Sequence, residues 1–219
     1  MVTITLDKIG KQYNNDWIFS DLSCEISPEN PTVILGSNGS GKSTLLQVIL
    51  SAITPTLGEV KYLNDAIIIA PENAFRLMAI SAPYIELIEE FTLEEMINFH
   101  RRLKPCYRNL TAMEVTKICK LEKSFHKPIR NFSSGMKQRV KLALAILSET
   151  PVLLLDEPTS NLDQAGIDWY NELIIKYYKN RTVIVSSNSI AHEFNFCKQN
   201  INLEDYKGIP VTDPSLLLF

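Results

Sequence analysis

One glycine-rich stretch decides the fold of this chain: Gly36-Ser37-Asn38-Gly39-Ser40-Gly41-Lys42-Ser43-Thr44. It matches the pattern G-x-x-x-x-G-K-[ST], in which glycines let successive backbone N–H groups point into one concavity that holds phosphate oxygens. An apolar strand, residues 32–35, precedes it, and the apolar residues 44–50 follow as a mostly buried helix. Because the N-terminus of a helix carries partial positive charge, the stretch predicts a phosphate-binding loop.

The side chains of this loop extend the predicted contacts. Lys42 is expected to neutralise the β- and γ-phosphates of a nucleotide, and Ser43 to offer its hydroxyl to Mg²⁺. All residues from Gly36 to Thr44 are predicted to bind the nucleotide. Glycine is scarce elsewhere, since the chain has 8 glycines in 219 residues. Their concentration here indicates a requirement of the backbone rather than filling of a loop.

A second site follows the apolar strand at residues 152–155. Asp156 and Glu157 come directly after it, at the edge of a parallel sheet where ligands bind. Asp156 is expected to hold Mg²⁺, and Glu157 to accept a proton from the water that attacks the γ-phosphate. A strand that ends in a solvated acidic turn is the alternative for these two residues taken alone.

A third stretch opens a helix with the residues Phe132-Ser133-Ser134-Gly135-Met136-Lys137-Gln138-Arg139. Serine and glycine at a helix start leave free N–H groups that can bind an anion. A plain helix cap is the alternative interpretation of this stretch.

Composition limits the class of protein. The chain has 219 residues, 45% of them hydrophobic and 21% charged, which is typical of a globular protein and excludes a disordered or fibrous one. Its formal net charge of −3 does not favour nucleic acid as a partner. Its apolar runs fall far short of the ~20 residues that span a bilayer. We expect no secretory signal. The four cysteines are scattered and include no Cys-x-x-Cys, which indicates reduced thiols. Both observations predict a cytosolic protein.

The order of elements indicates a β/α core. Alternating runs at residues 2–6 and 22–26 predict strands near the N-terminus, and further apolar strands at 152–155 and 182–185 alternate with helices. From about residue 83 to 148 the pattern becomes helical, with Thr92 and Glu95 forming a capping box and Met96, Phe99 and Leu103 at helical spacing.

The three motifs, in this order, resemble those of the nucleotide-binding subunits of ABC transporters. Residues 132–136 are similar to the family's Leu-Ser-Gly-Gly-Gln signature, with Ser134 in place of glycine and Met136 in place of glutamine. Residues 160–163 resemble the D-loop, which ends at Asp163. Tyr13 lies in a segment similar to the A-loop, whose aromatic ring stacks on adenine, and Trp17 is the competing ring. A tyrosine of a strand or of the core is the alternative for Tyr13. The resemblance runs from about residue 6 to 208.

The resemblance implies an α/β fold: a P-loop NTPase (RecA-like) core with an N-terminal antiparallel β subdomain and an inserted α-helical subdomain. Within one domain, 1–219, residues 1–82 and 149–219 would form the ATP-binding core and 83–148 the helical part. ATP and Mg²⁺ are the implied cofactors. The chain would form a head-to-tail dimer, either with a second copy or with a related chain. Each ATP would lie between the phosphate loop of one chain and a corner of the other chain, which is formed by Ser133, Ser134, Gly135 and Asp163. The apolar residues Tyr84, Ile85, Leu87, Ile88 and Phe91 would receive a coupling helix of an integral membrane permease. Packing of these side chains in the core of the helical part is the alternative.

Two departures from the family pattern affect catalysis. Residues 65–100 lack the glutamine that contacts Mg²⁺ and the attacking water, and either Tyr84 or Glu86 would take its place. The family's switch histidine aligns with Asn188, which can donate a hydrogen bond but has shorter reach and no charge. His192, one turn later, is interpreted as a surface residue. The expected activity is therefore slow ATP hydrolysis.

Two other functions stay open. One is a soluble ABC ATPase that acts on nucleic acid or ribosomes, although such chains usually carry two units or a long coiled coil. The other is a regulatory ABC subunit with little hydrolysis, which the two departures favour. The cargo, the direction of transport and the role of the apolar tail Leu216–Phe219 do not follow from the sequence.

Overall fold

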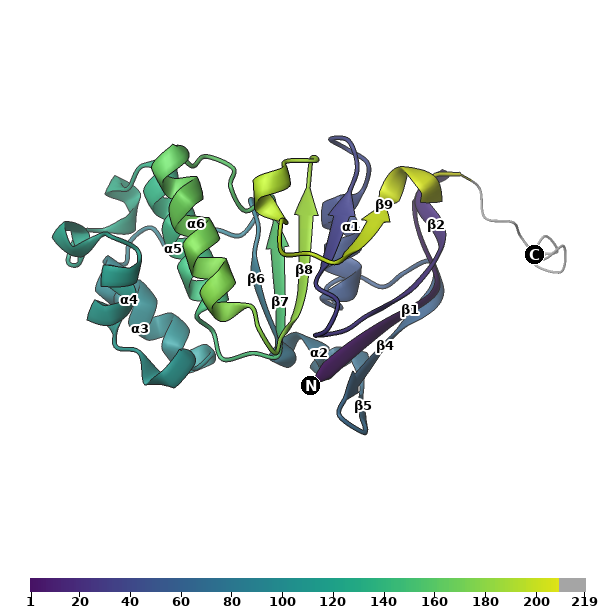
Figure 1. Cartoon of the computed structure of the whole chain (residues 1–219), viewed down its shortest axis with the longest axis horizontal. Coiled ribbons are helices and arrows are strands. Elements are labelled where there is room, and N and C mark those ends of the chain that lie inside the picture. The colour runs from purple at the N-terminus through teal and green to yellow at the C-terminus, as the bar shows by residue number, and fades with distance from the viewer. Residues whose placement is uncertain (209–219) are drawn as a thin grey trace, which may run out of the picture.

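The computed structural model describes residues 1–208, and its strands form two sheets (Figure 1). The strands of the antiparallel sheet, in the order β2-β1-β4-β5, are β1 (Val2–Tyr13), β2 (Asp16–Ile26), β4 (Leu57–Asn64) and β5 (Ile67–Ile69). The strands of the parallel sheet, in the order β6-β7-β8-β3-β9, are β3 (Thr32–Leu35), β6 (Met78–Ser81), β7 (Val152–Asp156), β8 (Thr182–Ser187) and β9 (Gln199–Asn202). The expected α/β fold class is thereby confirmed. The tail Leu216–Phe219 lies outside the described residues.

Four of the helices gather at one end of the molecule (Figure 1). The helices are α1 (Lys42–Ile49), α2 (Pro71–Ala74), α3 (Leu93–Leu103), α4 (Ala112–Ile118), α5 (Ser134–Ile146) and α6 (Gln164–Tyr177), and the short 3₁₀ helices η5 (Ala191–Glu193) and η6 (Leu203–Tyr206) follow β8 and β9. Figure 1 shows α3 to α6 on the left, the antiparallel sheet on the right and the parallel sheet between them. Within residues 1–208, no helix has both the length and the apolarity that crossing a bilayer would require.

The interior strand β7 lies between two hydrophobic cores. Leu153 and Leu155 pack into a core that includes residues of α3 to α6, whereas Val152 and Leu154 pack into one with α1 and the antiparallel sheet. All five residues of β7 are buried. Since alternate side chains of a strand point to opposite faces, an unbroken apolar run satisfies both cores. The predicted parallel sheet, covered on both faces, is confirmed.

The strands β1 and β2 are longer than the alternation of apolar residues predicts. The pairing of β1 with β2 shifts register between Leu6 and Ile9 and again before Gln12. Lys8 and Asp21 have positive φ angles of 48° and 55° at this part of the sheet. Such bulges break the period of two while the ladder of hydrogen bonds continues, so the sequence pattern ends before the strand does.

The capping box at the start of α3 is confirmed, but the apolar stripe of this helix is only partly buried. Thr92 Oγ1 accepts a hydrogen bond from the N–H of Glu95 at 3.2 Å, and the Thr92 N–H donates to Glu95 Oε2 at 2.8 Å. Phe99 and Leu103 are 40% and 66% exposed. Helical spacing places residues on one face, and only tertiary packing decides how far a neighbour covers that face.

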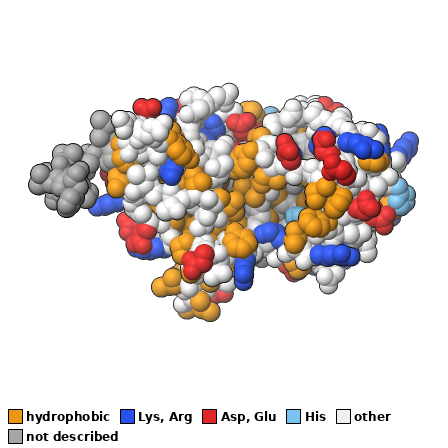
Figure 2. Space-filling view, turned by 180° about the vertical axis from the view of Figure 1, so that it is seen from behind, with side chains coloured by type: hydrophobic (Ala, Val, Ile, Leu, Met, Phe, Trp, Pro, Cys, Tyr) orange, Lys and Arg blue, Asp and Glu red, His pale blue; other side chains and the backbone are white. Residues whose placement is uncertain are grey.

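Further apolar side chains lie at the surface. On the face opposite to that of Figure 1, hydrophobic side chains stand among charged ones (Figure 2). Ile67 and Ile68 of the edge strand β5 are 66% and 80% exposed. Single exposed apolar residues are common on folded proteins, and nothing in the structure shows what covers these two.

Candidate functional site

The phosphate loop lies between β3 and α1, as the motif predicts. Gly41 is the residue before α1 and has a φ of 103°, which side chains rarely allow. A Cβ atom at Gly41 would lie 2.2 Å from Ile18 Cγ2, and one at Gly36 would lie 2.4 Å from Ser40 Oγ. The loop is therefore closed tightly on itself and against β2, and the backbone conformation at Gly41 favours glycine.

Lys42 lies inside this loop, 4% exposed. Its ammonium group donates hydrogen bonds to the carbonyl oxygens of Gly36 at 3.0 Å and Ser37 at 2.9 Å, and to Asn188 Oδ1 at 2.6 Å. Burial lowers the pKa of Lys42, while the carboxylates of Glu157 and Asp156 act in the opposite direction. These contacts hold the positive charge of Lys42 within the loop, where an anionic ligand would bind.

Asn188 bridges Lys42 and Glu157. Its Nδ2 donates to Glu157 Oε1 at 2.8 Å, while its Oδ1 accepts from Lys42. Because an ammonium group can only donate and a carboxylate can only accept, this pair of contacts determines the orientation of the amide. The three residues come from α1, from the end of β7 and from the end of β8, so the parallel sheet brings them together.

Asp156 ends β7 beside Ser186 of β8, its partner in the register of the sheet. Asp156 is 1% exposed, and its Oδ1 accepts a hydrogen bond from the Ser186 hydroxyl. Its Oδ2 is buried and has no hydrogen-bond partner among the described residues. An unpartnered carboxylate oxygen suits Mg²⁺ or a water bound to it, so Asp156 and Ser43 of the loop fit the implied metal.

Glu157 adopts a strained backbone conformation. Its φ is 45°, in the left-handed region, and its N–H donates to the carbonyl oxygen of Ser186 at 3.0 Å. Strain of this kind costs about 1–3 kcal/mol and persists where the surroundings enforce it. Here it turns the chain at the sheet edge, so that Glu157 meets Asn188 while Asp156 stays buried.

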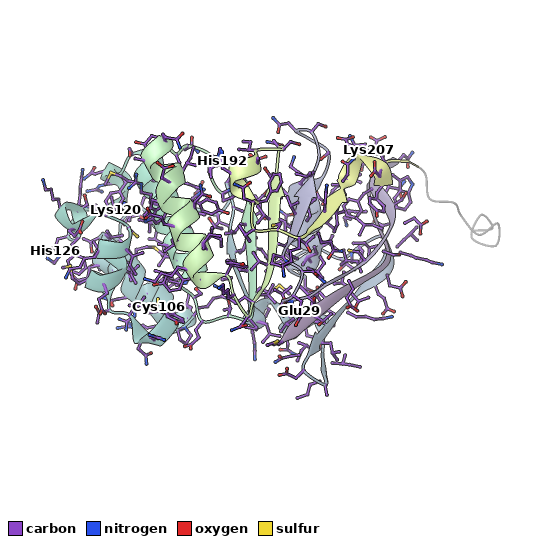
Figure 3. All side chains as sticks on the ribbon, in the orientation of Figure 1. Glu29, Cys106, Lys120, His126, His192 and Lys207 are labelled. Atoms are coloured by element: carbon purple, nitrogen blue, oxygen red, sulfur yellow. The ribbon has the colours of Figure 1, made fainter. Side chains whose placement is uncertain are left out.

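Glu204 is a neighbour of the phosphate loop that the sequence did not predict. Its Oε1 accepts hydrogen bonds from the Ser37 N–H at 3.1 Å and from Ser37 Oγ at 2.6 Å. Hydrogen bonds from Lys207 and Ser37 lower the pKa of Glu204 to about 2. Lys207 follows η6 and is labelled in Figure 3. The segment after β9 therefore holds the first turn of the loop.

Tyr13 and Trp17, the two candidate stacking rings, differ in their surroundings. Tyr13 ends β1, is 46% exposed and has Lys11 Nζ at 5.0 Å from its ring centroid. Trp17 packs on Gly10, because a Cβ there would lie 3.0 Å from the indole ring. Tyr13 is thus the more accessible ring, close to the part of β2 that contacts the phosphate loop.

The signature corner lies at the start of α5, where Ser133 Oγ accepts the N–H of Met136 at 3.2 Å. Asp163 caps α6, because its Oδ1 accepts the N–H of Gly166 at 2.8 Å. Both regions line one cavity of about 370 Å³, whose lining residues are Leu121, Ser133, Ser134, Gly135, Met136, Arg139, Asn161, Leu162 and Asp163. The structure therefore brings Ser133, Ser134, Gly135 and Asp163 together.

Tyr84 and Glu86 face different surroundings. Burial of part of the side chain raises the pKa of Tyr84, and the charge of Asp156 adds a smaller effect in the same direction, while 44% of the residue stays exposed. Glu86 lines a cavity of about 390 Å³ with Pro83, Ile85, Leu87, Glu89, Lys137 and Lys141. The phenol of Tyr84 is therefore within electrostatic range of Asp156, and Glu86 lies beside Lys137 and Lys141.

The predicted site residues thus form two groups. Lys42, Asp156, Glu157 and Asn188 meet at the carboxyl edge of the parallel sheet, and the signature corner with Asp163 forms the other group. Among residues 1–208, no hydrogen bond or ion pair joins the groups directly. The sequence offered no signal for Ser186 or Glu204, whose contacts with Asp156 and Ser37 arise only from the pairing of distant strands and the path of the chain after β9.

Comparisons with known proteins agree with these observations. YcbN of Bacillus subtilis, an uncharacterized ABC transporter ATP-binding protein, is 29% identical over 185 residues; the match covers 84% of this chain but only 60% of that protein. The Nod factor export ATP-binding protein I of Paraburkholderia xenovorans is 26% identical, over 98% of this chain and 72% of that protein.

A dimeric structure of the ATP-binding cassette MJ0796, described as a post-hydrolysis state bound to ADP and Pi, superposes with a TM-score of 0.76. The two sequences are 24% identical, and the match covers 91% of this chain and 93% of the MJ0796 chain. A likeness at this level of identity shows the fold alone. The family model for the ABC transporter family matches residues 19–160. This chain belongs to the ABC transporter family and is related to its ATP-binding proteins.

Proposed function

We propose that this chain is the ATP-binding and hydrolysing subunit of an ABC transporter, and that it drives a separate membrane permease from the cytoplasmic face. The observation that carries the proposal is the phosphate loop between β3 and α1 together with Asp156 at the end of β7, whose Oδ2 has no hydrogen-bond partner among the described residues. We further propose that residues 1–219 form one nucleotide-binding domain, with 83–148 as its helical part.

The chain's own residues account for nucleotide binding. Backbone N–H groups of residues 36–44 would hold the phosphates, and Lys42 would exchange its contact with Asn188 for phosphate oxygens. Tyr13 would stack on the adenine. Bound Mg²⁺, held by Ser43 and Asp156, would neutralise charge on the β- and γ-phosphates.

Hydrolysis would depend on Glu157 as the base. Its carboxylate is held by Asn188 at 2.8 Å, so that it can accept a proton from a water directed at the γ-phosphate. Asn188 would then donate to the γ-phosphate, as a neutral and shorter group than imidazole. Because Tyr84 supplies no amide near the metal, we expect turnover to be slow.

The separation of the two residue groups supports a head-to-tail dimer. Ser133, Ser134, Gly135 and Asp163 of one chain would complete the phosphate site of the other, which is a copy of this chain or a related one. Since the γ-phosphate would link two anion-binding surfaces, its removal would release the dimer.

The permease is expected to dock at the cavity beside Ile85 and Leu87. Affinity purification of the tagged chain from detergent-solubilised membranes should recover one integral membrane protein, identified by mass spectrometry. Ile85→Asp should abolish the recovery, because a charge would enter the apolar interface. Ile175→Asp, on an α6 residue that is 51% exposed, is the matched control and should leave recovery unchanged. Ribosomal proteins or nucleic acid in place of a membrane protein would contradict the proposal.

Asn188→His is expected to raise the rate of hydrolysis roughly tenfold, since a longer and chargeable donor would reach the γ-phosphate. Steady-state phosphate release measures the rate, and Ile190→His, at a position 40% exposed, is the control. An unchanged rate in Asn188→His would mean that Asn188 is not the cause of slow turnover.

A regulatory subunit with little hydrolysis is the second candidate. The observation that favours it is the contact of Asn188 with both Lys42 and Glu157, which satisfies these groups without a nucleotide. Phosphate release that no substitution of Glu157 slows would support this second function.

A further inference from the structure

Glu193 is a buried carboxylate that the motifs do not include. It ends η5, five residues after Asn188, and is 1% exposed. Its Oε1 accepts the N–H of Thr159 at 3.0 Å and the Thr159 hydroxyl at 2.6 Å, and its Oε2 accepts the Ser187 hydroxyl. A carboxylate removed from water costs free energy unless hydrogen bonds satisfy it, and these three donors do so.

These contacts join two segments of the candidate site. Thr159 lies two residues after Glu157, and Ser187 directly precedes Asn188. One side chain therefore ties the segment that carries Glu157 to the segment that carries Asn188. The neighbouring Pro158 carbonyl also accepts a hydrogen bond from Gln138 Nε2 of α5 at 2.8 Å, so the loop after β7 is held from both sides.

The 3₁₀ helix η5 adds a contact of its own. His192, labelled in Figure 3 beside the end of β8, is half-buried rather than on the surface, and its Nε2 lies 3.2 Å from Thr159 Oγ1. Because the Thr159 hydroxyl donates its proton to Glu193, it accepts from His192. The Tyr170 hydroxyl donates to the backbone carbonyl of Glu193 at 2.8 Å, which anchors η5 without touching the carboxylate.

We propose that Glu193 is a positioning residue for hydrolysis: by holding Thr159 and Ser187 it keeps Glu157 and Asn188 within hydrogen-bond distance of each other. The inference rests on the proposed ATPase function. A catalytic group must be held within about 0.5 Å of its productive place, and the buried Glu193 side chain adds three hydrogen bonds that join the two loops. Among the described residues, the Glu193 carboxylate makes no hydrogen bond to Lys42, Asp156, Glu157 or Asn188.

Three substitutions at this residue separate positioning from simple loss of packing. Glu193→Ala removes all three contacts and should lower kcat by about 10- to 100-fold, with the KM for ATP changed less than about twofold, because misplacement of a catalytic group has effects of this size. Glu193→Gln should retain kcat within about threefold, since its Oε1 can accept both Thr159 donors and its Nε2 can donate to Ser187. Glu193→Asp, one methylene shorter, should lower kcat about tenfold.

Tyr170→Phe is the matched control. It removes a buried hydrogen bond to the same residue but leaves the carboxylate contacts, so it should lower the melting temperature without lowering kcat. Equal losses of kcat in Tyr170→Phe and Glu193→Ala would overturn the proposal, as would wild-type kcat in Glu193→Ala. If Glu193→Ala does not fold, the Asp and Gln variants decide, and equal kcat in those two would overturn it.

Amide hydrogen exchange tests the same proposal without turnover. Glu193→Asp should accelerate exchange in residues 157–163 relative to both wild type and Tyr170→Phe, and unchanged exchange would overturn the positioning role. A wild-type chain that hydrolyses no ATP would refute the proposed function, and exchange would still decide the role of Glu193.

Discussion

Glu157→Gln is expected to lower steady-state phosphate release by about 10³-fold, equivalent to about 4 kcal/mol of activation free energy. The amide cannot accept the proton of the attacking water, whereas the phosphate loop and Lys42 are unchanged. Without hydrolysis, the γ-phosphate should keep two chains joined. Light scattering with saturating MgATP should therefore give twice the monomer mass of 24.8 kDa.

The exposed Glu172 on α6 provides the control for this substitution. Glu172→Gln makes the same change of charge and should leave both rate and mass as in the wild type. If wild type and Glu157→Gln release phosphate at the same rate, Glu157 is not the base. A monomer of Glu157→Gln at saturating MgATP would count against the dimer even if hydrolysis were lost.

Lys42→Ala is expected to weaken MgATP binding by about 100-fold, or about 2.7 kcal/mol. Lys42 is nearly fully buried, and its charge is already held by two carbonyl oxygens and Asn188. A hydrogen bond to a charged group contributes about 1.5–3 kcal/mol, so loss of the phosphate contacts accounts for the expected change. Isothermal titration calorimetry gives the dissociation constant directly.

Lys61→Ala removes an exposed ammonium group that pairs with Glu59 at 2.7 Å and with Asp7 at 3.3 Å. It should bind MgATP as the wild type does, because surface ion pairs contribute little and this one lies outside the loop. Equal affinity in Lys42→Ala and wild type, with far-UV circular dichroism showing both folded, would exclude Lys42 from the phosphate site.

Much of the fold was predictable from local pattern. The loop at Gly36–Thr44, the capping box at Thr92 and the buried strands β7 and β8 each carry their signal within a few adjacent residues. The lengths of β1 and β2 were not predictable, because bulges near Lys8 and Asp21 break the alternation while pairing continues. The exposure of Leu103 was not predictable either, since it depends on which element covers the helix.

The candidate site divides in the same way. The types of residue needed for phosphate, metal and water were readable in order along the chain, and the roles assigned to them stay predictions until tested. Only the folded chain showed that Tyr84 lies within electrostatic range of Asp156 and that Glu86 lines a cavity beside Lys137 and Lys141. Glu193 and Glu204 belong to no motif. Each lies in a 3₁₀ helix and contacts a residue that is distant in sequence, Thr159 for Glu193 and Ser37 for Glu204.

By itself, the sequence determined that a phosphate loop, a pair of carboxylates and a serine-glycine corner lie on a β/α scaffold. This was possible because each feature depends on the conformational freedom of glycine, the caps of helices or the burial of one strand, all of which act over short distances. Only the tertiary structure decided that Asn188 joins Lys42 to Glu157 and that Glu193 holds both loops. Contacts of this kind depend on the register of parallel strands, where one-residue differences in pairing or turn length change which side chains meet.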